Sequence, residues 1–273
     1  MVEKISIGGQ AVIEGVMMRS PQWLATAVRK PSGEIVYKNT KISSNRGKLA
    51  KIPFVRGAVS LFDALVMRIK ELTFSANQSE VEEEEQITQK EAVMTTVVSL
   101  ALGIGLFVVI PSLIGSFVFS NNKIHSNLLE AVLRLVFFIF YIWVISFSKD
   151  VKRVYEYHGA EHKSIYAYEN GLELTPENAK KFTTPPHRCG TSFLLIVMLI
   201  SIIVFSCMDF ILPVPKDMLQ KIIIKVVLRV IMMPVIAGIS YEIQRYSSNH
   251  LDRCWVKLVA FPGLSLQRIT TKE

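Results

Sequence analysis

Four long runs of apolar side chains constrain this 273-residue chain more than any other feature. Each run has about twenty residues or more, and an α-helix of that length crosses the roughly 30 Å hydrocarbon core of a bilayer. Half of all residues are hydrophobic, and the mean hydropathy of +0.35 is unusual for a soluble protein. We therefore expect a mainly α-helical, polytopic membrane protein with spans at Ala92–Phe119, Leu128–Phe147, Ser192–Leu212 and Ile222–Tyr241.

Some residues within these runs are unusual for helices surrounded by lipid. Gly103, Gly105 and Pro111 predict a kink in the first span or its early end near the proline. Charged residues spaced four apart lie in the second and fourth runs: Glu130 with Arg134, and Lys225 with Arg229. The acid and base of the second run are expected to pair along their helix. The two bases of the fourth run are expected to reach the bilayer surface or a partner carboxylate.

Basic residues flank the runs unevenly and predict their orientation. Thirteen Lys and Arg precede the first run, seven lie in 148–191 and five follow residue 243, whereas the connection 120–127 holds only Lys123. Because basic loops stay on the cytoplasmic side, both chain ends are expected there. Contact with anionic headgroups of the lipid bilayer then explains the net charge of +8, and no nucleic-acid recognition is predicted.

The sequence outside the spans divides into shorter units. Trp23–Pro31 and Ile35–Ile42 are extended runs joined by Ser32-Gly33-Glu34, which predicts a hairpin in a small cytoplasmic β-rich element. Apolar residues at helical spacing then indicate an amphipathic helix on the membrane surface or against the spans. The expected segments are the β-rich element 1–52, this helix and an acidic linker at 53–91, spans at 92–147 and 192–245, a cytoplasmic segment 148–191 and a cytoplasmic tail 246–273.

The sequence His158-Gly-Ala-Glu161-His162 places two imidazoles and a carboxylate on one face of a predicted helix, Lys149–Glu169. In the H-x-x-E-H arrangement the histidines bind zinc and the glutamate accepts a proton from the attacking water. We predict that His158 and His162 are zinc ligands and that Glu161 is a general base. The alternative is a helix whose polar face is rich in histidine by chance.

Zinc needs at least a third protein ligand. His187 and Cys189 are the nearest in sequence, in the loop before the third span, and they return to the same face of the membrane. A capping or headgroup-contacting role is the alternative for His187, and a buried thiol is the alternative for Cys189. Arg188 between them is expected to bind a substrate anion or a lipid phosphate.

Two carboxylates elsewhere in the sequence are further candidates. Glu242, near the end of the fourth run, is an alternative third ligand, or else an ion-pair partner of Arg245 or Arg153. Glu14 lies among apolar residues and glycines near the N-terminus. It is a ligand or an acid, although a paired structural carboxylate is the preferred interpretation, because a carboxylate among apolar residues needs a partner.

Four segments resemble the signature segments of the YqhQ-like family of bacterial membrane proteins: Gly8–Pro21, Tyr157–Lys163, His187–Phe193 and Pro262–Leu264. The resemblance covers nearly the whole chain. It implies the bacterial inner membrane as the location and an uncharacterised function, with a label of metal-dependent enzyme that rests on the same histidines. Relatives commonly read His-Pro-Arg-Cys where this chain has Pro186-His-Arg-Cys189, which retains the three reactive side chains.

Two functions of different classes follow from these features. The first is a zinc-dependent hydrolase at the cytoplasmic boundary, acting on a membrane-protein or lipid substrate. The second is a non-catalytic factor for membrane-protein biogenesis or assembly that docks to a translocon, insertase or ribosome, with the polar cluster as a structural metal site. Glycines on the span faces suit helix association, and a homo-oligomer is one partner arrangement that the sequence leaves open. A transporter is less favoured, because the spans carry few acids.

Overall fold

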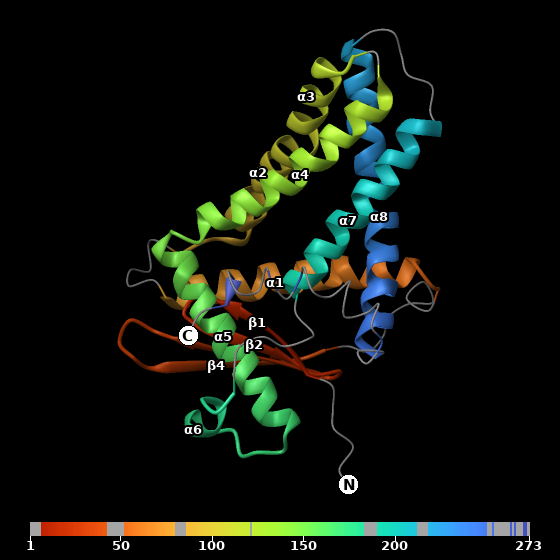
Figure 1. Cartoon of the computed structure of the whole chain (residues 1–273). Coiled ribbons are helices and arrows are strands. Elements are labelled where there is room, and N and C mark those ends of the chain that lie inside the picture. The colour runs from red at the N-terminus through yellow and green to blue at the C-terminus, as the bar shows by residue number, and fades with distance from the viewer. Residues whose placement is uncertain are drawn as a thin grey trace.

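A computed structural model describes residues 7–42, 52–79, 86–120, 122–182, 190–211 and 218–249, and the single positions 253, 263, 265, 270 and 271. A small sheet with two long helices packed on it forms one end of the described structure, and a group of long apolar helices extends from it (Figure 1). The predicted mainly α-helical class with an N-terminal sheet is confirmed.

The sheet is an antiparallel meander of four strands in the order β1-β2-β3-β4. The strands are β1 Gly8–Val12, β2 Gly15–Arg19, β3 Trp23–Arg29 and β4 Ile35–Lys41. The predicted hairpin is confirmed as β3–β4, and Gly33 adopts the positive φ of 86° in its turn. Side chains alternate along β3, so that Leu24, Thr26 and Val28 are buried.

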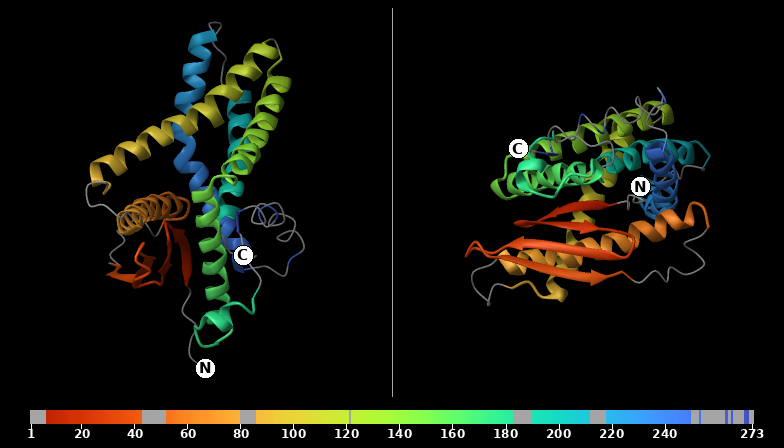
Figure 2. Two further views of the ribbon diagram at one scale, coloured as in Figure 1. Left: turned by 90° about the vertical axis from the view of Figure 1, so that its left-hand side faces the viewer. Right: turned by 90° about the horizontal axis from the view of Figure 1, so that it is seen from below.

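Helix α1, Val55–Ser79, packs against the sheet and lies between it and the apolar helices (Figure 1, Figure 2). Met67 and Phe74 of this helix pack on the sheet core, which consists of Val12, Met17, Leu24 and Val28. Glu71 is buried beside them, but its carboxylate accepts hydrogen bonds from Thr26 Oγ1 at 2.7 Å and Lys38 Nζ at 2.9 Å. The helix expected here is confirmed, and the sheet covers part of its surface.

Four helical segments are long and apolar enough to cross a bilayer: Gln89–Val118, Lys123–Ile145, Phe193–Ile211 and Ile222–Ser247. The first is continuous and consists of α2 Gln89–Ile104, a π-helical turn η3 Gly105–Val109 and α3 Ile110–Val118. The others belong to α4 Lys123–Ile145, α7 Gly190–Ile211 and α8 Met218–Asn249. The irregularity predicted in the first span is therefore a π-turn just before Pro111, and the helix does not end there.

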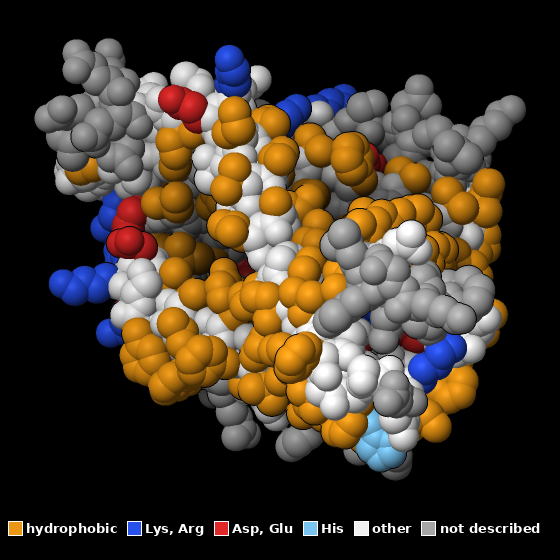
Figure 3. Space-filling model, turned by 90° about the horizontal axis from the view of Figure 1, so that it is seen from above, with side chains coloured by type: hydrophobic (Ala, Val, Ile, Leu, Met, Phe, Trp, Pro, Cys, Tyr) orange, Lys and Arg blue, Asp and Glu red, His pale blue; other side chains and the backbone are white. Residues whose placement is uncertain are grey.

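The surface of these helices is apolar. Seen from the end away from the sheet, hydrophobic side chains cover much of the described surface (Figure 3). Large side chains such as Phe117 and Ile211 are 79% and 81% exposed. Exposure of apolar area on this scale is unfavourable in water and favourable in lipid. The chain is a multi-pass membrane protein.

Helix α5, Lys149–Glu169, lies along the sheet beside the edge strand β1 (Figure 2). The predicted helix is confirmed, but it does not continue directly from the second span: the chain turns at 146–148, where Ser148 adopts an extended conformation as the N-cap of α5. The predicted end of the helix is confirmed, since Gly171 has a φ of 71°. The short helix α6, Pro176–Ala179, follows and is capped by the Thr175 side chain.

Helices α1 and α8 meet at two glycines and so join the sheet end to the spans. A Cβ on Gly57 would lie 2.8 Å from Gly238 Cα, so the two backbones approach closely only because neither residue has a side chain. Beside this contact, Arg56 Nε donates a hydrogen bond to Glu242 Oε1 at 2.6 Å.

Candidate metal centre

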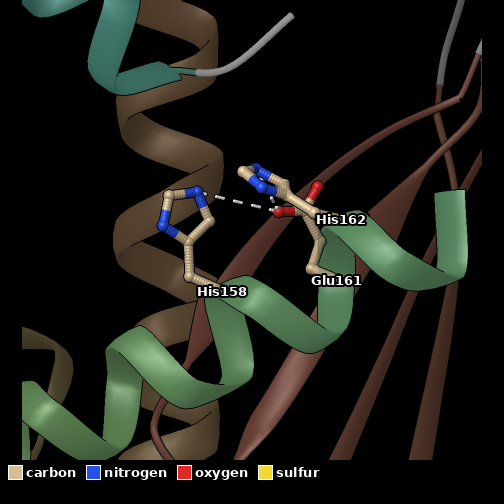
Figure 4. Close-up of side chains that lie close together, drawn as sticks. All are labelled: His158, Glu161 and His162. Atoms are coloured by element: carbon tan, nitrogen blue, oxygen red, sulfur yellow. Dashed lines mark ion pairs between the residues drawn. The ribbon is translucent and has the colours of Figure 1, made fainter. Parts of the chain in front are cut away.

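Helix α5 brings the three residues of the H-x-x-E-H sequence together. Their side chains project from one side of the helix and converge (Figure 4). Glu161 Oε2 lies 3.5 Å from His162 Nε2 and 3.9 Å from His158 Nε2. One ligand atom from each residue lies within 4.8 Å of the other two, which suits a shared metal ion. A search of the described residues for three or more His, Cys, Asp or Glu side chains that could hold one ion finds these three.

The ring of His158 is oriented by a backbone carbonyl from the other end of the chain. Its Nδ1 lies 2.9 Å from the Thr270 carbonyl oxygen. Because a carbonyl only accepts hydrogen bonds, the proton of the neutral ring belongs on Nδ1, and the lone pair then belongs on Nε2. Metal-binding histidines usually donate their second ring N–H in this way. The contact with Thr270 thus prepares Nε2, the nitrogen nearer to Glu161, as a ligand.

The cluster is largely shielded from water, since Glu161 is 4% exposed and His162 is 2% exposed. Burial raises the pKa of Glu161 to about 7, although the neighbouring His158 and Arg68 side chains act in the opposite direction. A carboxyl that titrates near neutral pH can both accept and release a proton under physiological conditions. In the metal-free cluster, burial thus brings the pKa of the Glu161 carboxyl into the neutral range.

Gly9 of β1 provides the space that the Glu161 side chain occupies. A Cβ built on Gly9 would lie 2.6 Å from Glu161 Cγ, and closer still to one carboxylate oxygen. The strand backbone and the carboxylate are therefore in direct contact, and any larger residue at position 9 would displace one of them. The sequence around Gly9 does not identify Glu161 as its partner.

Gly9→Ala is expected to lower the free energy of unfolding by about 1–3 kcal/mol, because the added methyl group overpacks the contact with Glu161. Gly8→Ala is the matched control, since nothing lies within 4 Å of a Cβ at that position. Its effect should stay within about 0.5 kcal/mol. Unfolding of both variants in detergent micelles measures the difference, and equal stabilities would contradict the packing described here.

Glu14 lies at the turn between β1 and β2, with a φ of 49°. Its carboxylate accepts hydrogen bonds from Arg153 Nε at 2.9 Å, Arg153 Nη2 at 3.1 Å and Tyr157 Oη at 3.0 Å. These contacts attach the turn to α5 directly before His158. Glu14 therefore lies in an ion pair that positions the helix, as the preferred interpretation of the sequence has it.

The Glu14 pair gives a pH-dependent contribution to stability. Hydrogen bonding to Arg153 lowers the pKa of Glu14 in the folded protein below its ordinary value of 4.5. The stabilisation is therefore present above that ordinary value and is lost as the pH falls through the lower folded-state value. Glu14→Gln should cost about 0.5–1 kcal/mol at neutral pH and almost nothing in strong acid. Unfolding free energies across this range test the expectation, and a pH-independent difference would refute it.

The structure places the other predicted ligands as follows. Glu242 lies at the contact of α1 with α8, in an ion pair with Arg56, a partner that the sequence does not single out. It is not one of the three converging residues. His187, Arg188 and Cys189 lie outside the described residues, so their roles remain predictions from the sequence.

Comparison with known proteins agrees with this architecture and assigns no activity. Residues 52–273 match the model of a family described as "Protein of unknown function (DUF1385)". The chain is 34% identical over 285 residues to "Uncharacterized protein YqhQ" of Bacillus subtilis (strain 168), covering 97% of this chain and 86% of that protein. No solved structure matches the chain. The chain therefore belongs to the YqhQ-like DUF1385 family, whose function is unknown.

Proposed function

We propose that this protein is a zinc-dependent hydrolase of the bacterial inner membrane, with its reaction centre on α5 at the cytoplasmic surface. The observation that supports this most is the hydrogen bond from His158 Nδ1 to the Thr270 carbonyl, 2.9 Å long. It sets the His158 tautomer that a metal needs, next to His162 and a buried carboxylate. The basic residues around 148–191 and after residue 243 support the cytoplasmic orientation.

The residues of the cluster would have separate roles. His158 and His162 would hold the ion through ring nitrogens, and His187 or Cys189 would complete the site as the sequence predicts. Zinc, when bound, supplies Lewis-acid activation of a carbonyl group and of water. Glu161 would accept the proton of the attacking water and return it to the leaving group, for which a pKa of about 7 is suitable.

The position of the proposed centre supports a substrate at the membrane surface. Three residues separate the end of the second span from the start of α5, and α1 beside the sheet exposes apolar side chains such as Phe62 and Leu65. An exposed apolar helix at this level suits contact with the lipid interface. An amide bond of a membrane protein or an ester bond of a lipid fits this location.

A non-catalytic role in membrane-protein assembly is the second function that an observation favours. Glu161 and His162 are 4% and 2% exposed, and structural metal sites are closed in this way whereas catalytic sites keep an open position. In that case the ion would fix α5 against β1 and the C-terminal segment, and the sheet would dock to a translocon, insertase or ribosome.

Complementation of a strain that lacks the protein separates the two functions. Glu161→Gln removes the general base but keeps a side chain of the same size, and Glu156→Gln on the same helix is the control. If the site is catalytic, Glu161→Gln should retain zinc and fail to complement, while Glu156→Gln complements. Full complementation by Glu161→Gln would refute the hydrolase, and co-purification of insertase components with both variants would favour the assembly factor.

A further inference from the structure

Charged side chains of three spans are buried together in the half of the bundle away from the sheet. They are Glu130 and Arg134 of α4, Asp209 of α7, and Lys225 and Arg229 of α8, here called the charge cluster. Glu130 and Arg229 are each 2% exposed, Arg134 is 5% exposed and Lys225 is 9% exposed. Charges at this depth in a membrane are costly and usually have a function.

Each carboxylate of the charge cluster has more than one cationic partner. Glu130 pairs with Lys225 at 2.7 Å, Arg229 at 2.6 Å and Arg134 at 3.1 Å. Asp209 pairs with Lys225 at 3.2 Å and Arg229 at 3.1 Å. The predicted Glu130–Arg134 pair and the predicted carboxylate partners of Lys225 and Arg229 are confirmed. Ser112 of α3 also contacts Glu130 and Arg229, so the cluster connects all four spans.

The charges of this cluster do not balance. Three cations face two carboxylates among the described residues, which leaves one positive charge in excess. Outside the cluster, the described residues at this end of the bundle, 122–134, 209–211 and 218–229, add Lys123 and Lys221 and no Asp or Glu. An excess cation in hydrocarbon is strongly unfavourable unless an anion accompanies it.

Unsatisfied donors accompany the excess charge. Within the described part of the chain, four buried atoms near the charge cluster have no hydrogen-bond partner. They are Arg134 Nε, Asn127 Nδ2, Ser116 Oγ and Ser126 Oγ. Asn127 and Ser126 lie one helical turn before Glu130, and Ser116 lies one turn after Ser112. All four atoms can donate a hydrogen bond. The missing partner is therefore an acceptor, and the charge balance requires that it be negative.

We infer that the charge cluster binds an anionic phosphate group between α3, α4 and α8. Guanidinium groups match the oxygens of a phosphate with parallel N–H donors, and Lys225 adds a point charge. Asp209 is the outermost charge of the cluster, two residues before the end of α7, with 15% of its side chain exposed. The cluster therefore reaches the end of the bundle, where the phosphate of an anionic lipid or a free phosphate ion could enter.

The test uses full-length protein, stripped of lipid and placed in nanodiscs of phosphatidylcholine with and without phosphatidylglycerol. Native mass spectrometry then measures which lipid is retained. The wild type should retain phosphatidylglycerol roughly tenfold more tightly. Arg134→Gln balances the cluster at two cations and two carboxylates, and should lose that preference. Lys123→Gln removes an exposed charge from the same end and should keep it. Equal retention by the wild type and Arg134→Gln would overturn the inference, as would equal losses in both variants.

Two further measurements complete the test. Asp209→Asn increases the excess charge, so it should raise phosphatidylglycerol retention severalfold even if Arg134→Gln fails to fold, and unchanged retention would count against the site. Inorganic phosphate added to the protein in neutral detergent distinguishes the source. Thermal stabilisation by phosphate without a lipid preference, lost in Arg134→Gln, assigns the site to free phosphate. A wild type that responds to neither phosphate nor phosphatidylglycerol overturns the inference.

Discussion

Glu130→Ala is expected to lower the free energy of unfolding of the span bundle by roughly 3–5 kcal/mol, because it leaves buried cations without their main counter-charge. Glu130 accepts hydrogen bonds from Lys225 Nζ, from Arg134 and Arg229 Nη2, and from Ser112 Oγ. After its removal, Asp209 is the carboxylate that remains for three cations in the described structure. Unfolding by SDS in mixed micelles measures the loss.

Glu156→Ala is the control for this substitution. Glu156 pairs with Arg153 on the surface of α5, where the Glu156 side chain is 31% exposed and the Arg153 side chain is 49% exposed. An exposed pair contributes at most about 1 kcal/mol. A restoring variant is available as well, since Arg134→Gln added to Glu130→Ala removes one of the uncompensated cations and should recover part of the stability. Equal effects of Glu130→Ala and Glu156→Ala would show that the buried network does not hold the spans together.

Glu161→Gln is expected to stabilise the metal-free protein by about 3 kcal/mol above neutral pH. The folded-state pKa of Glu161 is raised from its ordinary 4.5 to about 7, because the carboxylate is buried. Between these two values the unfolded chain has released the proton while the folded chain still holds it. The wild type therefore loses stability as the pH rises through this window, and the loss is complete above about 7.

The glutamine variant lacks this titration, so its stability relative to the wild type should be pH-dependent. Below about pH 4.5 the two proteins should be equally stable, and above about pH 7 the variant should be more stable. Thermal unfolding after treatment with a chelator measures both limits. A variant that is less stable than the wild type at neutral pH would contradict the destabilising burial of the Glu161 carboxylate. Added zinc should stabilise both proteins, since the two histidines that would hold it are present in both.

The sequence predicts the elements that depend on local patterns. Apolar runs of sufficient length define the spans, and Asn170-Gly171 defines the end of α5. The spacing of His158, Glu161 and His162 on a helix requires only helical geometry, so their convergence is foreseeable. The β3–β4 hairpin follows from its turn residues in the same way.

Contacts between distant segments are less predictable. Nothing local to Thr270 indicates that its carbonyl lies 2.9 Å from His158 Nδ1, because the two residues are 112 positions apart. Glu242 has Arg245 and Arg153 as plausible partners by sequence, but the close approach of Gly57 to Gly238 brings Arg56 to it. The turn at 146–148 likewise depends on α5 packing against β1, which outweighs the tendency of the second span to continue.

The charge cluster shows the same distinction. The i, i+4 spacing predicts the Glu130–Arg134 pair within α4, and this pair forms. The excess of one cation becomes evident only when α4, α7 and α8 are assembled and their charges are counted together.

Metal analysis of the purified protein tests the proposed centre most directly. Zinc content would be measured in the wild type, in His158→Ala and His162→Ala, and in His125→Ala as the matched control, since His125 is exposed at the start of α4. The wild type and His125→Ala should each contain about one zinc ion per chain, and the other two variants should contain almost none. Absence of zinc from the wild type, or equal zinc in all four proteins, would contradict a metal centre at His158 and His162.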